Sequence, residues 1–142
     1  MARYGLVVAR FYDELAQRLE AGARSVLAGA GEEVEVFDVE GAFELASAAS
    51  YAAASGRFAG IVCLGAVIRG ETDHYDHVCA AAAQGIQSVS IESSVPCTFG
   101  VLTVENYEQA LARSGGDKRD SGAHAAQAAL ALARIRERLR LG

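Results

Sequence analysis

Apolar residues recur along this chain in two alternating patterns, one typical of buried strands and one typical of helices with one apolar face. Short apolar runs, or strict alternation in one case, predict four strands, at residues 4–9, 34–39, 58–64 and within 95–104. Helical spacing or alanine-rich composition predicts helices at residues 13–28, 42–55, 75–88, 107–113 and 122–141.

Strands that alternate with helices are typical of a parallel sheet covered on both faces. The chain has 142 residues and shows no linker and no internal repeat, so we expect one domain over residues 1–142. The predicted fold class is α/β, a three-layer α/β/α sandwich around a four-stranded parallel sheet.

Composition and charge argue against two classes of binding partner, nucleic acids and membranes. The formal net charge of −5 argues against nucleic-acid binding, which depends on basic residues. Arginines at 134, 136, 138 and 140 lie in the last turns of a predicted helix, where cations complement the helix dipole. No apolar run reaches the roughly 20 residues of a membrane helix, so no membrane partner is expected.

The predicted location is the cytoplasm. The first residues enter a strand-like run at once, which leaves no room for a signal peptide. Cys63, Cys79 and Cys97 are odd in number and form no Cys-x-x-Cys pair, so we expect buried, reduced thiols.

The most informative stretch runs from Gly65 to Cys79. A buried strand is expected to end at Gly65, followed by a polar turn and a helix that begins near Asp73 or His74. In open α/β sheets, ligands bind at such carboxyl ends of strands. Gly70 permits a backbone conformation that other residues resist, and amides next to a helix N-terminus favour a phosphate. Thr72 or Asp73 could equally serve only as a helix cap.

His74 would stand at the first turn of that helix, where an imidazole can accept and release protons near neutral pH. A structural role is the alternative. His77 lies three residues on and could share a metal ion with His74, but no third ligand is evident. We therefore expect no metal site.

Three aromatic residues are expected at three strand ends: Phe11, Phe43 and Phe99. Each is compatible with packing alone. Together they favour a site for a planar, partly apolar ligand.

These motifs together resemble the lumazine synthase family over nearly the whole chain. The most specific is the run Gly-Ala-Val-Ile-Arg-Gly-x-Thr-x-His at residues 65–74. Weaker matches are Ala-Arg-Phe at 9–11, Gly-Ala-Phe-Glu at 41–44, Phe-Gly-Val-Leu-Thr at 99–103, and Glu-Gln-Ala at 108–110 with Arg113.

The resemblance implies a flavodoxin-like fold and a specific reaction in riboflavin biosynthesis. Family members condense 5-amino-6-(D-ribitylamino)uracil with 3,4-dihydroxy-2-butanone 4-phosphate. The products are 6,7-dimethyl-8-ribityllumazine, phosphate and water. The implied partners are these small-molecule substrates, and no metal or organic cofactor is implied.

By similarity, one group of residues would bind the ring and ribityl chain of the uracil substrate: Phe11, Ala42, Phe43, Glu44, Val67 and Ile68. Gly70, Glu71, Thr72 and Arg113 would hold the phosphate of the second substrate. His74 would transfer protons during the condensation.

The resemblance also implies a homo-oligomer, a pentamer or a multiple of it, because Phe99 and Arg113 of family members approach the pocket from a neighbouring subunit. The chain begins only a few residues before its first strand, so we expect an isolated or paired pentamer rather than a shell.

The sequence departs from the family pattern near residue 121. Ser121 and His124 stand where members usually carry a lysine and an acid, and Lys118 or Arg119 could supply the missing charge. Tyr12 replaces a frequent asparagine. These changes leave open a low-activity paralogue that binds lumazine or flavin. A flavodoxin-like electron carrier is a further alternative, although residues 10–13 make a poor phosphate loop.

Overall fold

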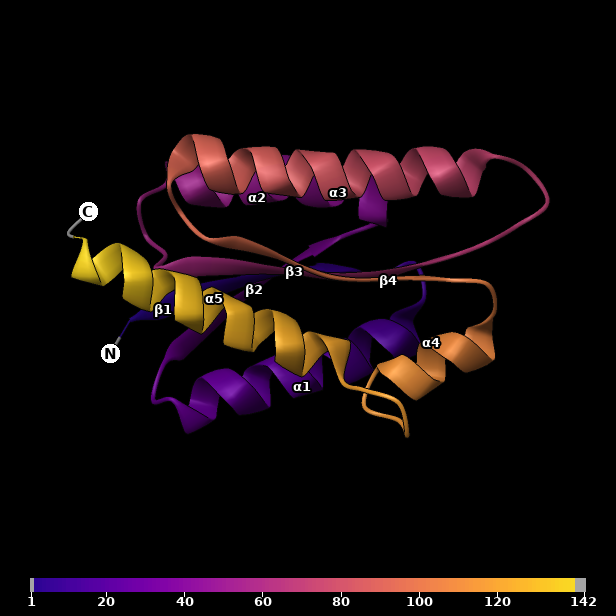
Figure 1. Ribbon diagram of the computed structural model, residues 1–142, viewed down its shortest axis with the longest axis horizontal. Helices are drawn as coiled ribbons and strands as arrows, with labels where there is room; N and C mark the ends of the chain where they lie inside the picture. Colours follow the sequence, from indigo (N-terminus) through magenta and orange to yellow (C-terminus); the bar gives the residue numbers. More distant parts are fainter. Residues whose placement is uncertain (1, 140–142) are drawn as a thin grey trace.

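Four parallel strands form one sheet in the computed structural model, which describes residues 2–139 (Figure 1). The spatial order is β2-β1-β3-β4, so β1 and β3 lie in the middle and β2 and β4 at the edges. The strands are β1 (Arg3–Ala9), β2 (Glu33–Val39), β3 (Gly60–Ile68) and β4 (Cys97–Val104).

Helices cover both faces of this sheet, which confirms the three-layer α/β/α architecture. On one face lie α1 (Asp13–Gly29), α4 (Tyr107–Arg113) and α5 (Ser121–Arg138), and on the other lie α2 (Leu45–Ala54) and α3 (His74–Ser93) (Figure 1). Within residues 2–139, none of these helices is long and apolar enough to cross a membrane.

The core consists of two apolar layers, one on each side of the sheet. Successive residues of β1 alternate between them: Leu6 and Val8 pack toward α1 and α5, whereas Val7 and Ala9 pack toward α2. The helical pattern predicted for residues 13–28 buries its apolar stripe in the first layer, through Leu15, Leu19, Ala23 and Leu27.

The prediction that the third strand ends at Gly65 is wrong, because β3 continues to Ile68. The additional residues are paired with the second half of β4, from Gly65 opposite Val101 to Ile68 opposite Val104. These hydrogen bonds to a neighbouring strand extend β3 beyond its fully buried segment.

Helix boundaries differ modestly from the prediction. The segment expected to be helical from Ala42 begins with a 3₁₀ turn, Ala42–Glu44, before α2. Helix α3 runs five residues past Ser88, to Ser93. Helix α5 ends at Arg138, and the predicted continuation to Leu141 lies outside the described residues.

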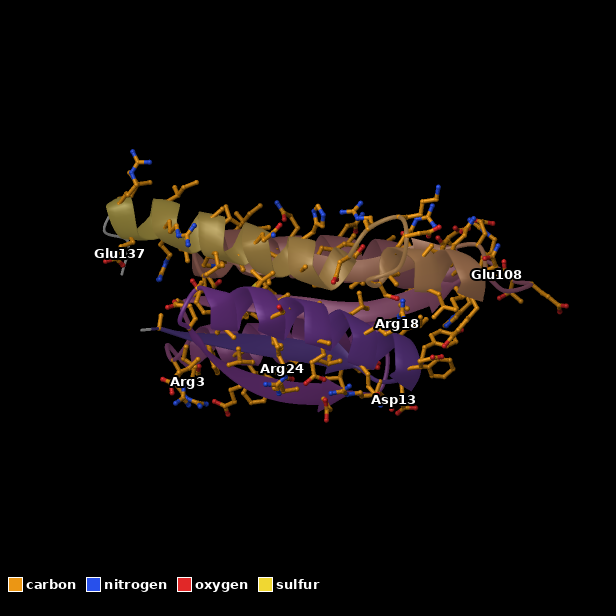
Figure 2. The ribbon with its side chains drawn as sticks, turned by 90° about the horizontal axis from the view of Figure 1, so that it is seen from below. Arg3, Asp13, Arg18, Arg24, Glu108 and Glu137 are labelled. Atoms are coloured by element: carbon orange, nitrogen blue, oxygen red, sulfur yellow. The ribbon has the colours of Figure 1, made fainter. Side chains whose placement is uncertain are left out.

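Helices α1 and α5 lie side by side, and Gly122 allows them to approach closely (Figure 2). A Cβ atom at Gly122 would overlap the backbone carbonyl oxygen of Leu19 in α1. Because that neighbour is backbone, it cannot rotate away as a side chain could.

We therefore expect Gly122→Ala to lower the free energy of unfolding by about 3 kcal/mol, as overpacking of a tight contact does. Urea unfolding at fixed protein concentration measures it. Gly29→Ala is the matched control, because a Cβ at Gly29 would meet nothing within 4 Å. Equal stability of the two variants would contradict this account of the helix contact.

Candidate active site

A cavity of about 660 Å³ opens where the carboxyl ends of β1, β2 and β3 meet. Strand order reverses at this point, since β2 and β3 lie on opposite sides of β1. The cavity is lined by seven of the predicted site residues: Phe11, Ala42, Phe43, Glu44, Val67, Ile68 and His74.

Two aromatic side chains of this cavity are unusually exposed for their size. Phe11 is 69% exposed and Phe43 is 61% exposed, although both are large apolar groups. Beneath them, Ala42 and Val67 are buried and form part of the apolar wall. Two exposed rings over an apolar wall form a surface suited to a flat ligand.

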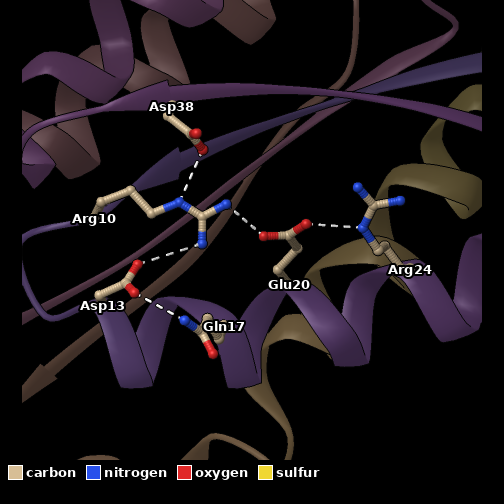
Figure 3. A network of polar contacts seen from close by, with 6 residues as sticks. All are labelled: Arg10, Asp13, Gln17, Glu20, Arg24 and Asp38. Atoms are coloured by element: carbon tan, nitrogen blue, oxygen red, sulfur yellow. Dashed lines mark hydrogen bonds and ion pairs between the residues drawn. The ribbon is translucent and has the colours of Figure 1, made fainter.

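Arg10 anchors the segment that carries Phe11 (Figure 3). Its guanidinium donates to Asp38, just before the end of β2, at 2.8 Å and to Glu20 in α1 at 2.5 Å. The Arg10 backbone N–H also donates to the Val39 carbonyl at 2.9 Å. Three hydrogen bonds, two to β2 and one to α1, therefore fix the residue that precedes the exposed ring.

The charges in this network stabilise one another. Partial burial raises the pKa of Glu20, but hydrogen bonds from Arg24 and Arg10 outweigh it and hold this pKa below its ordinary value. Burial likewise lowers the pKa of Arg10, and its bonds to Glu20 and Asp38 more than reverse the effect. Arg10 and Glu20 are thus both charged at neutral pH.

The 3₁₀ turn after β2 orients Glu44. Its Oε1 accepts a hydrogen bond from the Gly41 backbone N–H at 3.0 Å, which holds the carboxylate at the rim of the cavity. Glu44 is exposed and forms no ion pair within residues 2–139, so it can accept further hydrogen bonds.

His74 is the first residue of α3 and lines the same cavity. The Thr72 hydroxyl accepts the His74 backbone N–H at 3.2 Å, so Thr72 takes part in the helix start. His77 instead pairs with Asp73 at 3.2 Å, away from His74. Within residues 2–139 no group of three or more potential ligands could hold a metal ion.

Arg69 anchors the loop between β3 and α3. It donates to Glu105 at 3.1 Å, lies 3.7 Å from Asp76 and stacks over the Tyr75 ring at 4.3 Å from its centroid. The segment it anchors, residues 70–72, is exposed and does not line the cavity of this chain.

The prediction that Gly70 adopts a backbone conformation resisted by other residues is wrong. Gly70 does not adopt a positive φ, and a Cβ built there would meet nothing within 4 Å. Neither backbone geometry nor packing within the described chain requires glycine at this position.

Phe99 and Arg113 are not in the cavity with the other site residues. Phe99 is the third residue of β4 rather than a strand end, and it lines a hollow of about 380 Å³ beside Ser121 and His124. Arg113 lines an adjoining hollow of about 240 Å³ along β4. The expected convergence of three aromatic residues therefore does not occur within one chain.

Sequence reasoning missed five residues that line the cavity: Tyr12, Glu40, Gly41, Ala66 and Val78. Helical spacing could have indicated Val78, which lies one turn beyond His74 on the same face of α3. The others flank residues that were selected, and only the assembled strand ends show that they take part.

The cysteines do not contribute a nucleophile to the cavity. All three are free thiols. Cys63 and Cys97 are buried as expected, whereas Cys79 is only partly buried. Burial raises the pKa of the Cys97 thiol to about 12 and also raises the pKa of Cys63. Both stay protonated at neutral pH.

Comparison with known proteins identifies the family. A family model described as 6,7-dimethyl-8-ribityllumazine synthase matches residues 1–137. The chain belongs to the lumazine synthase family. It is accordingly an enzyme of riboflavin biosynthesis, a transferase with small-molecule substrates, which confirms the resemblance.

Relatives named 6,7-dimethyl-8-ribityllumazine synthase match nearly end to end. The protein from Erythrobacter litoralis is 45% identical over 97% of this chain and 98% of its own length. The Novosphingobium aromaticivorans protein is 46% identical over 97% and 99%. The Arabidopsis thaliana protein, whose name adds "chloroplastic", is 45% identical over 95% of this chain and 61% of its own. Nothing in these matches supports the alternative hypothesis of a low-activity paralogue that binds lumazine or flavin.

The lowered pKa of Glu20 gives a pH-dependent contribution to stability. We expect Glu20→Gln to lower the free energy of unfolding by about 0.5–1 kcal/mol at pH 7. Because the folded pKa is below the unfolded value of about 4.3, this difference is full above pH 4.3 and shrinks as the pH falls through the folded pKa.

Urea unfolding at several pH values from 7 to 3 measures the difference in unfolding free energy between wild type and Glu20→Gln. Glu108→Gln is the control, since Glu108 is exposed and forms no ion pair within residues 2–139. A difference between wild type and Glu20→Gln that does not change with pH would contradict the charge network.

Proposed function

We propose that this chain, acting as a single domain over residues 1–142, condenses 5-amino-6-(D-ribitylamino)uracil with 3,4-dihydroxy-2-butanone 4-phosphate. The products are 6,7-dimethyl-8-ribityllumazine, phosphate and water. The observation that carries the proposal is the cavity, in which seven residues selected for this reaction meet from four separate segments.

In this proposal the cavity binds the uracil substrate. Phe11 stacks on the pyrimidine ring, and Val67 and Ile68 contact its edge. Phe43 and Ala42 line the ribityl side, where Glu44 accepts hydrogen bonds from hydroxyl groups. The exposure of Phe11 supports its role. The carboxylate of Glu44 is fixed by the Gly41 N–H and has no ion-pair partner among residues 2–139, which supports its role.

The butanone phosphate is bound by the loop before α3 and by Arg113 of a second copy. Residues 70–72 offer backbone N–H groups and the Thr72 hydroxyl next to a helix N-terminus. Phe99 lies on the edge strand β4 and Arg113 is the last residue of α4, and both line hollows separate from the cavity. This separation supports a site shared between subunits, in a pentamer or a multiple of it.

Catalysis then rests mainly on holding both substrates in one geometry, which can supply roughly 7–11 kcal/mol. The substrate amine attacks the ketone, a first water leaves as an imine forms, and phosphate is eliminated. The ring closes when the ribitylamino nitrogen attacks the remaining carbonyl carbon and a second water leaves. His74 takes protons from the amine and delivers them to leaving oxygen atoms. The proposed location is the cytoplasm, which the free thiols support.

Mixing the purified protein with both substrates tests the proposal. We expect lumazine absorbance to rise with the release of one phosphate per lumazine formed. Sedimentation of the same sample measures the assembly. Tight binding of the uracil substrate without product would contradict the proposed activity, and a monomer with full activity would contradict the shared site.

His74→Ala should lower kcat by roughly 10²–10⁴-fold, the range for a lost acid–base group, and should leave measurable turnover from substrate positioning. Steady-state kinetics on assembled enzyme provides the measurement. His77→Ala is the matched control, because His77 lies on the same helix, pairs with Asp73 and lines no part of the cavity.

An unchanged kcat in His74→Ala would refute its role in proton transfer. Complete loss of turnover in a correctly assembled variant would refute the proposed share of catalysis by positioning.

A further inference from the structure

Arg119 takes part in both hollows on the β4 side of the molecule. It lines the smaller hollow together with Arg113, and the larger one together with Phe99 and His124. Lys118, the other basic residue of this loop, lines neither hollow. The structure therefore distinguishes between two neighbouring cations that the sequence left equivalent.

The loop between α4 and α5 fixes the backbone of Arg119. Its N–H donates to the Ala112 carbonyl at 3.2 Å, and its carbonyl accepts the Gly115 N–H at 3.1 Å. Ser114 and Asp120 form a β-bridge that closes the loop. The side chain of Arg119 remains exposed.

Helix α1 supports the base of this loop through Arg18 (Figure 2). The Arg18 guanidinium donates to the Ser114 hydroxyl and to the Leu111 carbonyl, each at 3.0 Å. Asp120 accepts the Ala123 N–H at 3.0 Å and so caps α5. Contacts with α1, α4 and α5 thus hold the loop in one place.

The guanidinium groups of Arg113 and Arg119 have no acidic partners in the part of the chain that the structure describes. Two like charges beside one hollow repel each other unless an anion lies between them. Guanidinium groups bind phosphate oxygens well, because their planar donors match the geometry of the anion.

A phosphate monoester carries about 1.5 to 2 negative charges at pH 7. The phosphate-binding residues proposed above include one cation, Arg113, and they also include the carboxylate of Glu71. A second cation would balance the charge of the ligand. Ser121, at the position where family members usually carry a lysine, cannot provide it.

We propose that Arg119 is this second cation and binds the phosphate of the butanone substrate together with Arg113. The basic side chain that family members usually carry at position 121 would thus be replaced in this chain by the basic side chain at position 119. This inference rests on the proposed function, because it concerns the second substrate of that reaction.

Arg119→Gln tests the assignment. We expect the KM for butanone phosphate to rise roughly 10- to 100-fold, as for loss of a hydrogen bond to a charged group, with little change in the KM for the uracil substrate. Arg113→Gln should behave in the same way. Lys118→Gln is the matched control and should leave both KM values within about twofold, the small effect typical of an exposed charge.

A charge-relocation variant distinguishes binding from structure. Arg119→Gln combined with Ser121→Lys should recover most of the lost affinity for butanone phosphate, which restoration of loop structure alone would not explain. An unchanged KM in Arg119→Gln would overturn the inference. Loss of the wild-type sedimentation coefficient in that variant would also overturn it, because it would show an assembly role.

Calorimetric titration with inorganic phosphate separates this inference from the proposed function. Suppose that wild type forms no lumazine but binds phosphate more tightly than Arg119→Gln does. The proposed function then fails, and the assignment of Arg119 and Arg113 to phosphate binding stands. If wild type forms lumazine and phosphate binding is the same in wild type and Arg119→Gln, that assignment fails and the proposed function stands.

Discussion

The reversal of strand order at β1 determines where this molecule can bind a ligand. Because β1 and β3 are buried on both faces by two helical layers, functional side chains can emerge only at the strand ends or at the edges of the sheet. The cavity occupies the first of these places and the two hollows along β4 occupy the second. The sheet topology thus separates the candidate site residues of the cavity from those of the two hollows along β4.

Rigid anchors behind the cavity explain how exposed aromatic rings can be held in position. Arg10 joins β1, β2 and α1 immediately before Phe11, and Arg69 joins β3, α3 and Glu105 immediately before the loop proposed to bind phosphate. Each anchor is an arginine that directly precedes a segment proposed to contact substrate. Preorganised segments of this kind reduce the entropy that substrate binding must overcome.

The sequence alone predicts the layer order, the strands and most of the cavity, because buried strands and helix stripes have clear periods. It misplaces the end of β3, since the last residues of that strand depend on pairing with β4, which is distant along the chain. It cannot reveal the Arg10 network, whose members at 10, 20 and 38 meet only after folding. Nor can it choose between Lys118 and Arg119, because that choice depends on how a closed loop directs two adjacent side chains.

In the loop between α4 and α5, the backbone maintains the fold and the side chains carry the charge. Its backbone bonds, together with the contacts of Ser114 and Asp120, connect α4 to α5, whereas the side chains of residues 117–119 are exposed and form no hydrogen bond or ion pair within residues 2–139. Mutations at these three positions can therefore alter the local electrostatic potential without weakening the scaffold. Selection can therefore adjust the affinity for the proposed phosphate substrate through these positions in small steps, independently of protein stability.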